Sequence, residues 1–106
     1  MDERLVTRLS ALLEDQPVVL ASVLDTRGAT PRKSGSRMLV TASETAGSVG
    51  GGLAEARVIE AARRLLAQQG GHAEVGIDLT GRAGAAGICG GSMRIALQRW
   101  AGETDR

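Results

Sequence analysis

Aromatic residues are almost absent from this chain of 106 residues, which has one tryptophan, Trp100, and no phenylalanine or tyrosine. Proteins that bind single-stranded nucleic acid usually stack bases on aromatic side chains, so this composition argues against such a partner. The formal net charge of +1 gives no electrostatic reason to expect nucleic acid or a membrane surface. We therefore expect neither partner, and a core built from Val, Leu, Ile, Met and Ala.

Cysteine and histidine are equally scarce, with Cys89 and His72 the only residues of their types. One thiol cannot form an internal disulfide, and a four-ligand zinc site cannot come from one such chain, so no metal site is predicted. No apolar run approaches the roughly 20 residues of a membrane-spanning helix. The charged start MDERLVTRLS does not resemble a signal peptide, and we expect a cytoplasmic protein.

Hydrophobic periodicity predicts one α/β domain over residues 1–106, in which 100–106 is a polar tail. Its expected form is a mixed β-sheet of about four or more strands with two main helices packed against it. The helices are expected over 5–13, ended by Pro17, and over 53–66, followed by two glycines. The strands are expected over 18–24, 37–41, 73–79 and 92–100, with loops over 25–37 and 80–91.

Four glycines lie within GSVGGG, residues 47–52, directly before the second helix. The amide groups at a helix N-terminus and the helix dipole attract anions, and glycine lets an anion approach the backbone closely. This pattern favours a phosphate cradle with Ser48 as an added donor, although a tight turn with positive φ angles explains it too. Glu55 is expected to cap the helix or to contact a ligand ring.

Two further segments carry candidate chemistry. The loop over 25–37 holds Arg27, Arg32, Lys33 and Arg37 against Asp25, which is either a second wall of an anion site or a solvated surface. Cys89 lies in GICGGS, where a thiol near cations is either accessible and partly ionised or buried and inert.

Three segments, GATPRKSGSRMLV, GSVGGGLAEARVIEAA and DLTGRAGAAGICGGSMRI, together resemble the N-terminal domain of the XdhC/CoxI family. Members of this family are accessory proteins of xanthine dehydrogenase and related molybdenum hydroxylases. The resemblance implies a chaperone, not an enzyme, that binds molybdenum cofactor, assists its sulfuration and delivers it to an apo-hydroxylase. This cofactor is molybdopterin, with or without an appended nucleotide, and it is a small polyanion.

On the basis of this resemblance, we expect the glycine cradle to bind the phosphate of the cofactor and the arginines to neutralise its charge. Cys89 is expected to contact the dithiolene or molybdenum end. The full set of cofactor-binding candidates is Thr30, Arg32, Arg37, Gly47, Ser48, Gly50, Gly51, Gly52, Glu55, Cys89, Gly90 and Gly91. Family members often have a cysteine where this chain has Leu53, and they continue into a Rossmann-like domain. Further expected partners are therefore a separate Rossmann-like chain, a cysteine desulfurase and a second copy of the chain.

Two alternatives from other functional classes remain open. Cys89 could act as a nucleophile in a thiol enzyme, with the helix N-terminus as oxyanion donor, but His72 is the only imidazole available as its base. The chain could also be a subunit-interaction module without a ligand, in which the glycines serve turns and close packing.

Overall fold

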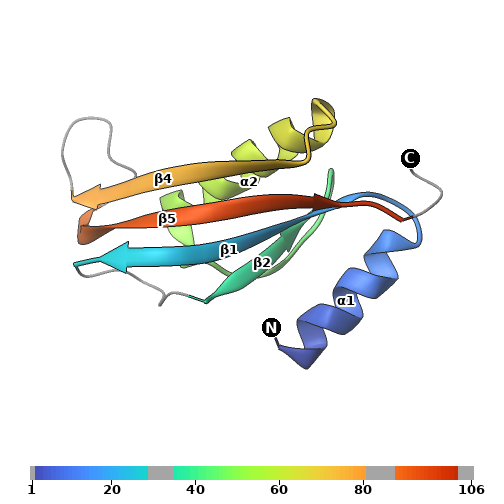
Figure 1. Cartoon of the computed structure of the whole chain (residues 1–106). Coiled ribbons are helices and arrows are strands. Elements are labelled where there is room, and N and C mark those ends of the chain that lie inside the picture. Colours follow the sequence, from blue (N-terminus) through green and yellow to red (C-terminus); the bar gives the residue numbers. More distant parts are fainter. Residues whose placement is uncertain (1, 29–34, 81–87, 103–106) are drawn as a thin grey trace.

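The computed structural model describes residues 2–28, 35–80 and 88–102, without the side chains of 79–80 and 88–90. The elements follow the order α1 (Glu3–Leu13), β1 (Val18–Arg27), β2 (Arg37–Val40), β3 (Thr45–Gly47), α2 (Gly52–Ala67), β4 (His72–Thr80) and β5 (Ile88–Trp100). The five strands form one sheet in the order β3-β2-β1-β5-β4 (Figure 1). The predicted α/β class with two packed helices is confirmed, and the strand pairings are antiparallel where a mixed sheet was expected.

The apolar run at the start of β1 is buried on both faces of the sheet, as predicted. Val19, Ala21 and Val23 point to one face and join the core under α2. Val18 and Leu20 point to the other face and pack against α1. Because successive residues of a strand point to opposite faces, two helices can bury one continuous apolar run.

The two faces are covered unequally. Helix α2 contacts β1, β2, β4 and β5, whereas the main contacts of α1 are with β1, β2 and β3. In Figure 1 the helix α2 lies behind the sheet, and α1 lies at one end, beside β1 and β2. Among the described residues, no helix covers the face opposite α2 over β4, β5 and the second half of β1; we call this the open face.

One strand was missed, and two predicted loop boundaries were wrong. Strand β3 was missed because three residues ending in Gly47 are too few to show a period, and its pairing with β2 decides its conformation. The loop expected over 25–37 is shorter, since β1 continues to Arg27. The loop expected over 80–91 ends earlier, because β5 begins at Ile88. Cys89, Gly90 and Gly91 therefore belong to a strand.

The helix boundaries agree with the prediction to within two residues. Asp2 is the N-cap of α1 and its carboxylate accepts a hydrogen bond from the Arg4 amide at 2.7 Å. The buried stripe of α2 consists of Ala54, Val58, Ala62 and Leu65. Neither helix is long and apolar enough to cross a membrane in the described part of the chain.

Candidate functional site

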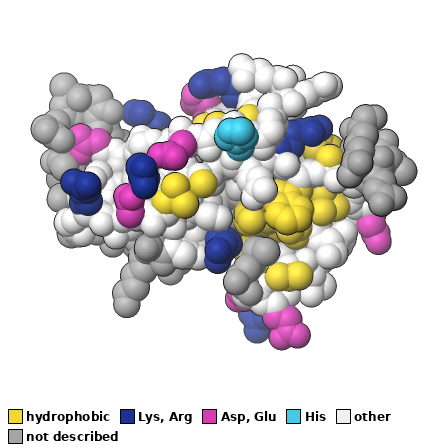
Figure 2. Space-filling view, viewed as in Figure 1, with side chains coloured by type: hydrophobic (Ala, Val, Ile, Leu, Met, Phe, Trp, Pro, Cys, Tyr) yellow, Lys and Arg dark blue, Asp and Glu magenta, His cyan; other side chains and the backbone are white. Residues whose placement is uncertain are grey.

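The open face carries polar side chains in register across three strands. One row consists of Asp25, Arg94 and Gly76, and the next consists of Arg27, Ser92 and Asp78. Figure 2 shows this face, with acidic and basic side chains intermixed over its left part and hydrophobic side chains gathered toward α1. The two rows thus form a charged surface at the end of the sheet that lies away from α1.

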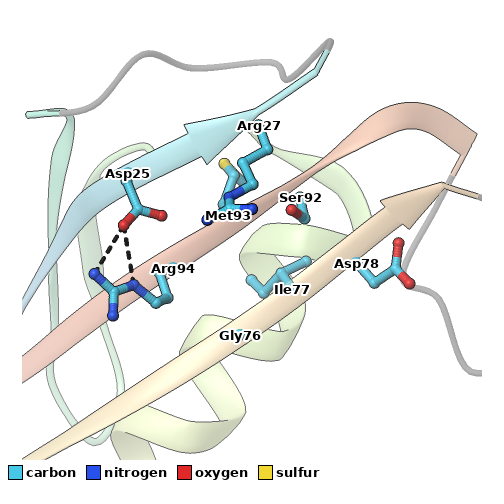
Figure 3. A pocket seen from close by; sticks show the side chains of 8 residues that line it. All are labelled: Asp25, Arg27, Gly76, Ile77, Asp78, Ser92, Met93 and Arg94. Atoms are coloured by element: carbon cyan, nitrogen blue, oxygen red, sulfur yellow. Dashed lines mark hydrogen bonds and ion pairs between the residues drawn. The ribbon is translucent and has the colours of Figure 1, made fainter.

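A hollow of about 590 Å³ lies over these two rows, and we call it the sheet-face hollow. Its lining residues are Asp25, Arg27, Gly76, Ile77, Asp78, Ser92, Met93 and Arg94 (Figure 3). Two aspartates oppose two arginines, so the formal charges of the lining cancel. A neutral hollow with many donors and acceptors suits a polar ring better than it suits a free phosphate.

Arg94 on β5 links its two neighbouring strands, β1 and β4, at one end of the hollow. Its Nε and Nη2 donate to Oδ2 of Asp25 at 3.0 and 2.8 Å, and its Nη1 lies 3.3 Å from Oε1 of Glu74. The side chains of Arg94 and Asp25 remain 54% and 51% exposed, so solvent screens the pair and its net stabilisation is below about 1 kcal/mol. The contacts nevertheless hold the guanidinium in one place on the open face.

Gly76 leaves bare backbone in the middle of β4. A Cβ atom built there meets nothing within 4 Å. A glycine inside a strand weakens the strand and often marks a place where a ligand approaches closely. Gly76 thus lowers the floor of the sheet-face hollow between Arg94 and Asp78.

The sheet-face hollow adjoins two of the three motif segments along the chain. Arg27 is followed by Gly28 and then by residues 29–34, and Ser92 is preceded by Cys89–Gly91. Thr30 and Arg32 lie outside the described residues, and so does the side chain of Cys89. The described residues next to these segments, Arg27 and Ser92, nonetheless line the same hollow, so one end of each segment lies at its edge.

A second hollow of about 290 Å³ lies beside the N-terminus of α1, and we call it the edge hollow. It is lined by Asp2, Leu5, Gly35, Ser36, Arg37, Gly47 and Ser48. The structure thus brings together Arg37, Gly47 and Ser48, three of the predicted binding residues. Gly47 has φ +80, and a Cβ there would lie 2.7 Å from the Arg37 carbonyl oxygen, so strand packing requires this glycine.

The rest of the glycine segment is partnered within the protein. Oε2 of Glu55 accepts from the Ser48 hydroxyl at 2.8 Å and from the Gly51 amide at 2.9 Å. The Gly50 amide donates to the Ser48 hydroxyl at 3.1 Å. Glu55 therefore caps α2, and its carboxylate lies where a ligand phosphate was predicted. Gly52 begins the helix and is exposed.

Cys89 lies far from both the edge hollow and His72. His72 pairs with Gln98, which is nine residues from Cys89 along β5, and this corresponds to roughly 30 Å of strand. Arg37 pairs with Ser22, and Ser22 pairs with Ala96, which places the Cys89 backbone roughly 25 Å from Arg37 by strand geometry. A Cys89–His72 catalytic pair within one chain is thereby excluded.

Gly76, Ser92 and Asp78 were missed as site residues by the sequence reasoning. A glycine interrupting the alternating pattern AEVGIDL was the available signal, because it faces the same side as Glu74 and Asp78. Arg94 was predicted to point outward, which the structure confirms. Its pairing with Asp25 depends on a register that periodicity does not reveal.

The chain was also compared with known proteins. Residues 11–76 match the XdhC and CoxI family. The uncharacterized protein YqeB of Escherichia coli strain K12 is 34% identical over 96 residues, which cover 83% of this chain and 17% of YqeB. A crystal structure from Bacillus halodurans, described as a xanthine dehydrogenase, has a TM-score of 0.69 and 27% identity. That match covers 84% of this chain and 29% of the other, so this chain spans less than a third of each relative. The chain belongs to the XdhC and CoxI family.

Proposed function

We propose that this chain is an accessory factor that binds molybdenum cofactor and helps to deliver it to a xanthine dehydrogenase-type hydroxylase. Membership of the XdhC and CoxI family and the likeness to a protein described as a xanthine dehydrogenase support this role. The observation that carries the proposal is the sheet-face hollow, where the ends of two family motif segments meet. Delivery to the enzyme, and a cysteine desulfurase as sulfur donor, are parts of the same proposal.

The hollows fit the two ends of such a cofactor. Molybdopterin has a flat polar ring system at one end and a phosphate at the other. The sheet-face hollow with its glycine floor suits the ring. The edge hollow holds Asp2 as well as Arg37, so its formal charges also cancel, and Arg37 is the group there that can pair with the phosphate. Arg37 on β2 lies two register positions and one strand from Asp25 on the same face, roughly 8 Å away by strand geometry.

Thr30, Arg32, Cys89, Gly90 and Gly91 stay assigned to the cofactor within this proposal. The segment with Thr30 and Arg32 connects Arg27 in one hollow to Gly35 in the other. Cys89 and the two glycines precede Ser92 at the edge of the sheet-face hollow. Within this proposal, Cys89 is assigned to the sulfur or metal end of the ligand on the basis of the family resemblance.

The test is retention of cofactor released from a donor molybdenum enzyme. The purified chain is mixed anaerobically with the released cofactor and passed over a gel-filtration column, and molybdenum and pterin are measured in the protein peak. We expect both to co-elute with the chain and Arg27→Ala to retain less. Arg64→Ala is the matched control, because Arg64 is exposed on α2 behind the sheet. If the unaltered chain retains no cofactor even at low salt, the proposal is overturned.

A further inference from the structure

The sheet-face hollow has a shape and a chemistry that specify one part of a ligand. Its polar lining forms two rows across three strands. Strand spacing and residue rise make this area roughly 7 by 10 Å, which suits a two-ring heterocycle lying flat. Asp25 and Arg94 lie at one end of the hollow and Asp78 at the other, with Gly76 between them (Figure 3).

Gly76 makes close contact with such a ring feasible. The absence of a side chain exposes the backbone of β4 directly beside the Arg94 guanidinium, which Asp25 and Glu74 hold from two sides. A guanidinium plane stacks on flat aromatic systems and donates in a fixed geometry. Any larger residue at this position would occupy the space that the ring needs.

The charged groups of the lining indicate which hydrogen-bonding groups the edge of the ring carries. A carboxylate only accepts hydrogen bonds and can receive two adjacent N–H donors, whereas a guanidinium only donates and matches two adjacent acceptors. A 2-amino-4-oxopyrimidine ring has adjacent N–H donors on one side and a carbonyl oxygen on another. The same complementarity lets Arg read the O6 and N7 atoms of guanine.

We propose that the sheet-face hollow is a slot for a 2-amino-4-oxopyrimidine ring, with Gly76 as its floor, and that the phosphate of the ligand binds elsewhere. The carboxylates of the lining accept from the ring N–H groups, while Arg27 and Ser92 donate to its acceptor atoms. This inference rests on the proposed function, since pterins carry this ring. Guanine nucleotides carry it too, so the ring can come from the pterin or from a nucleotide attached to the cofactor.

The experiment measures binding of free pterin and of guanosine monophosphate to the purified full chain. Pterin binding is followed by its intrinsic fluorescence and nucleotide binding by isothermal titration calorimetry. We expect pterin to bind, and Gly76→Val to weaken this binding at least tenfold because the new side chain fills the slot. Val suits a strand, and the φ of Gly76 is not in the left-handed region, so the variant is expected to fold. Ala73→Val on the same strand adds similar volume outside the hollow and should leave affinity within twofold.

The outcomes separate this inference from the proposed function. Binding of guanosine monophosphate but not pterin supports the slot and makes the nucleotide the source of the ring. Competition of inorganic phosphate with pterin at constant ionic strength would overturn the slot, because the hollow would then be an anion site. Retention of cofactor without binding of either ring, or equal loss in both variants, overturns the slot and leaves the proposed function standing. Binding of pterin without retention of the cofactor would support the slot and overturn the proposed function.

Discussion

Glu55 supplies an anion to the N-terminus of α2 from within the protein. Its Oε2 accepts hydrogen bonds from the Ser48 hydroxyl and the Gly51 amide at 2.8 and 2.9 Å. Gly51 is the N-cap and has no side chain of its own to do this. Replacing Glu55 by Ala therefore removes the cap and leaves the Gly51 amide and the Ser48 hydroxyl without this partner.

The size of the effect follows from these two contacts. A hydrogen bond to a charged group contributes about 1.5–3 kcal/mol, and removing an N-cap side chain costs about 0.5–2 kcal/mol. Glu55 is only partly buried, so solvent replaces some of what is lost. We expect Glu55→Ala to lower the free energy of unfolding by about 2 kcal/mol, which corresponds to a fall in Tm of roughly 10 °C for a domain of this size.

Guanidinium chloride titration followed by circular dichroism and by Trp100 fluorescence measures this change. Glu60→Ala is the matched control, because Glu60 forms only an exposed pair with Arg64 on the same helix, and its loss should cost about 0.3–0.5 kcal/mol. Sulfate should stabilise Glu55→Ala more than the unaltered chain, since an added anion can replace the lost carboxylate. Equal destabilisation by the two substitutions would refute the assignment of Glu55 as the cap.

Three further substitutions test the packing around the glycine segment by the same titration. Gly47→Ala should destabilise the fold by more than about 1 kcal/mol, because the new Cβ would lie 2.7 Å from the Arg37 oxygen at a φ of +80; an unchanged midpoint would contradict this. Val49→Ala should cost about 2–3 kcal/mol, because Val49 is completely buried under α2; a loss below about 0.5 kcal/mol would show that the segment is not anchored there. Leu53→Ser should change stability by less than about 0.5 kcal/mol, since Leu53 is 64% exposed, and a larger loss would reveal packing that the structure does not contain.

The elements with strong periodicity were predictable, and those set by pairing were not. The stripe of α2 and the apolar run of β1 follow from local spacing, so both appear in the sequence before any fold is known. Strand β3 has only three residues, and Cys89–Gly91 contain two glycines that suggest a turn. Strand β3 forms because β2 supplies its backbone partners. Cys89–Gly91 lie within β5 between Ile88 and Ser92, which pair with Thr80 and Asp78 of β4. Single-sequence patterns do not contain this pairing information.

The candidate site was predictable in part for the same reason. Arg37, Gly47 and Ser48 do line one hollow, although the sequence offered no proof that strands β2 and β3 bring them together. The sheet-face hollow was not foreseen, because Asp25, Gly76 and Arg94 are widely separated in sequence and meet only through strand register. What the sequence did contain was a glycine inside a strand and an outward-facing arginine.

The two sides of the sheet divide the predicted binding residues into separate groups. Val49 is buried under α2, so the chain passes around the β3 edge of the sheet between Ser48 and the helix. The Gly51 amide, which donates to Glu55, therefore lies on the α2 side. The sheet-face hollow lies on the opposite face. Ser48 connects the two groups, because it lines the edge hollow and its hydroxyl also contacts Glu55 and the Gly50 amide. A phosphate at the N-terminus of α2 would have to displace the Glu55 carboxylate from the Gly51 amide. Arg37 lies on the same face as the sheet-face hollow. If the proposed ring slot is occupied, the phosphate of the ligand can pair with Arg37, and the ligand would then follow the open face from Gly76 toward β2.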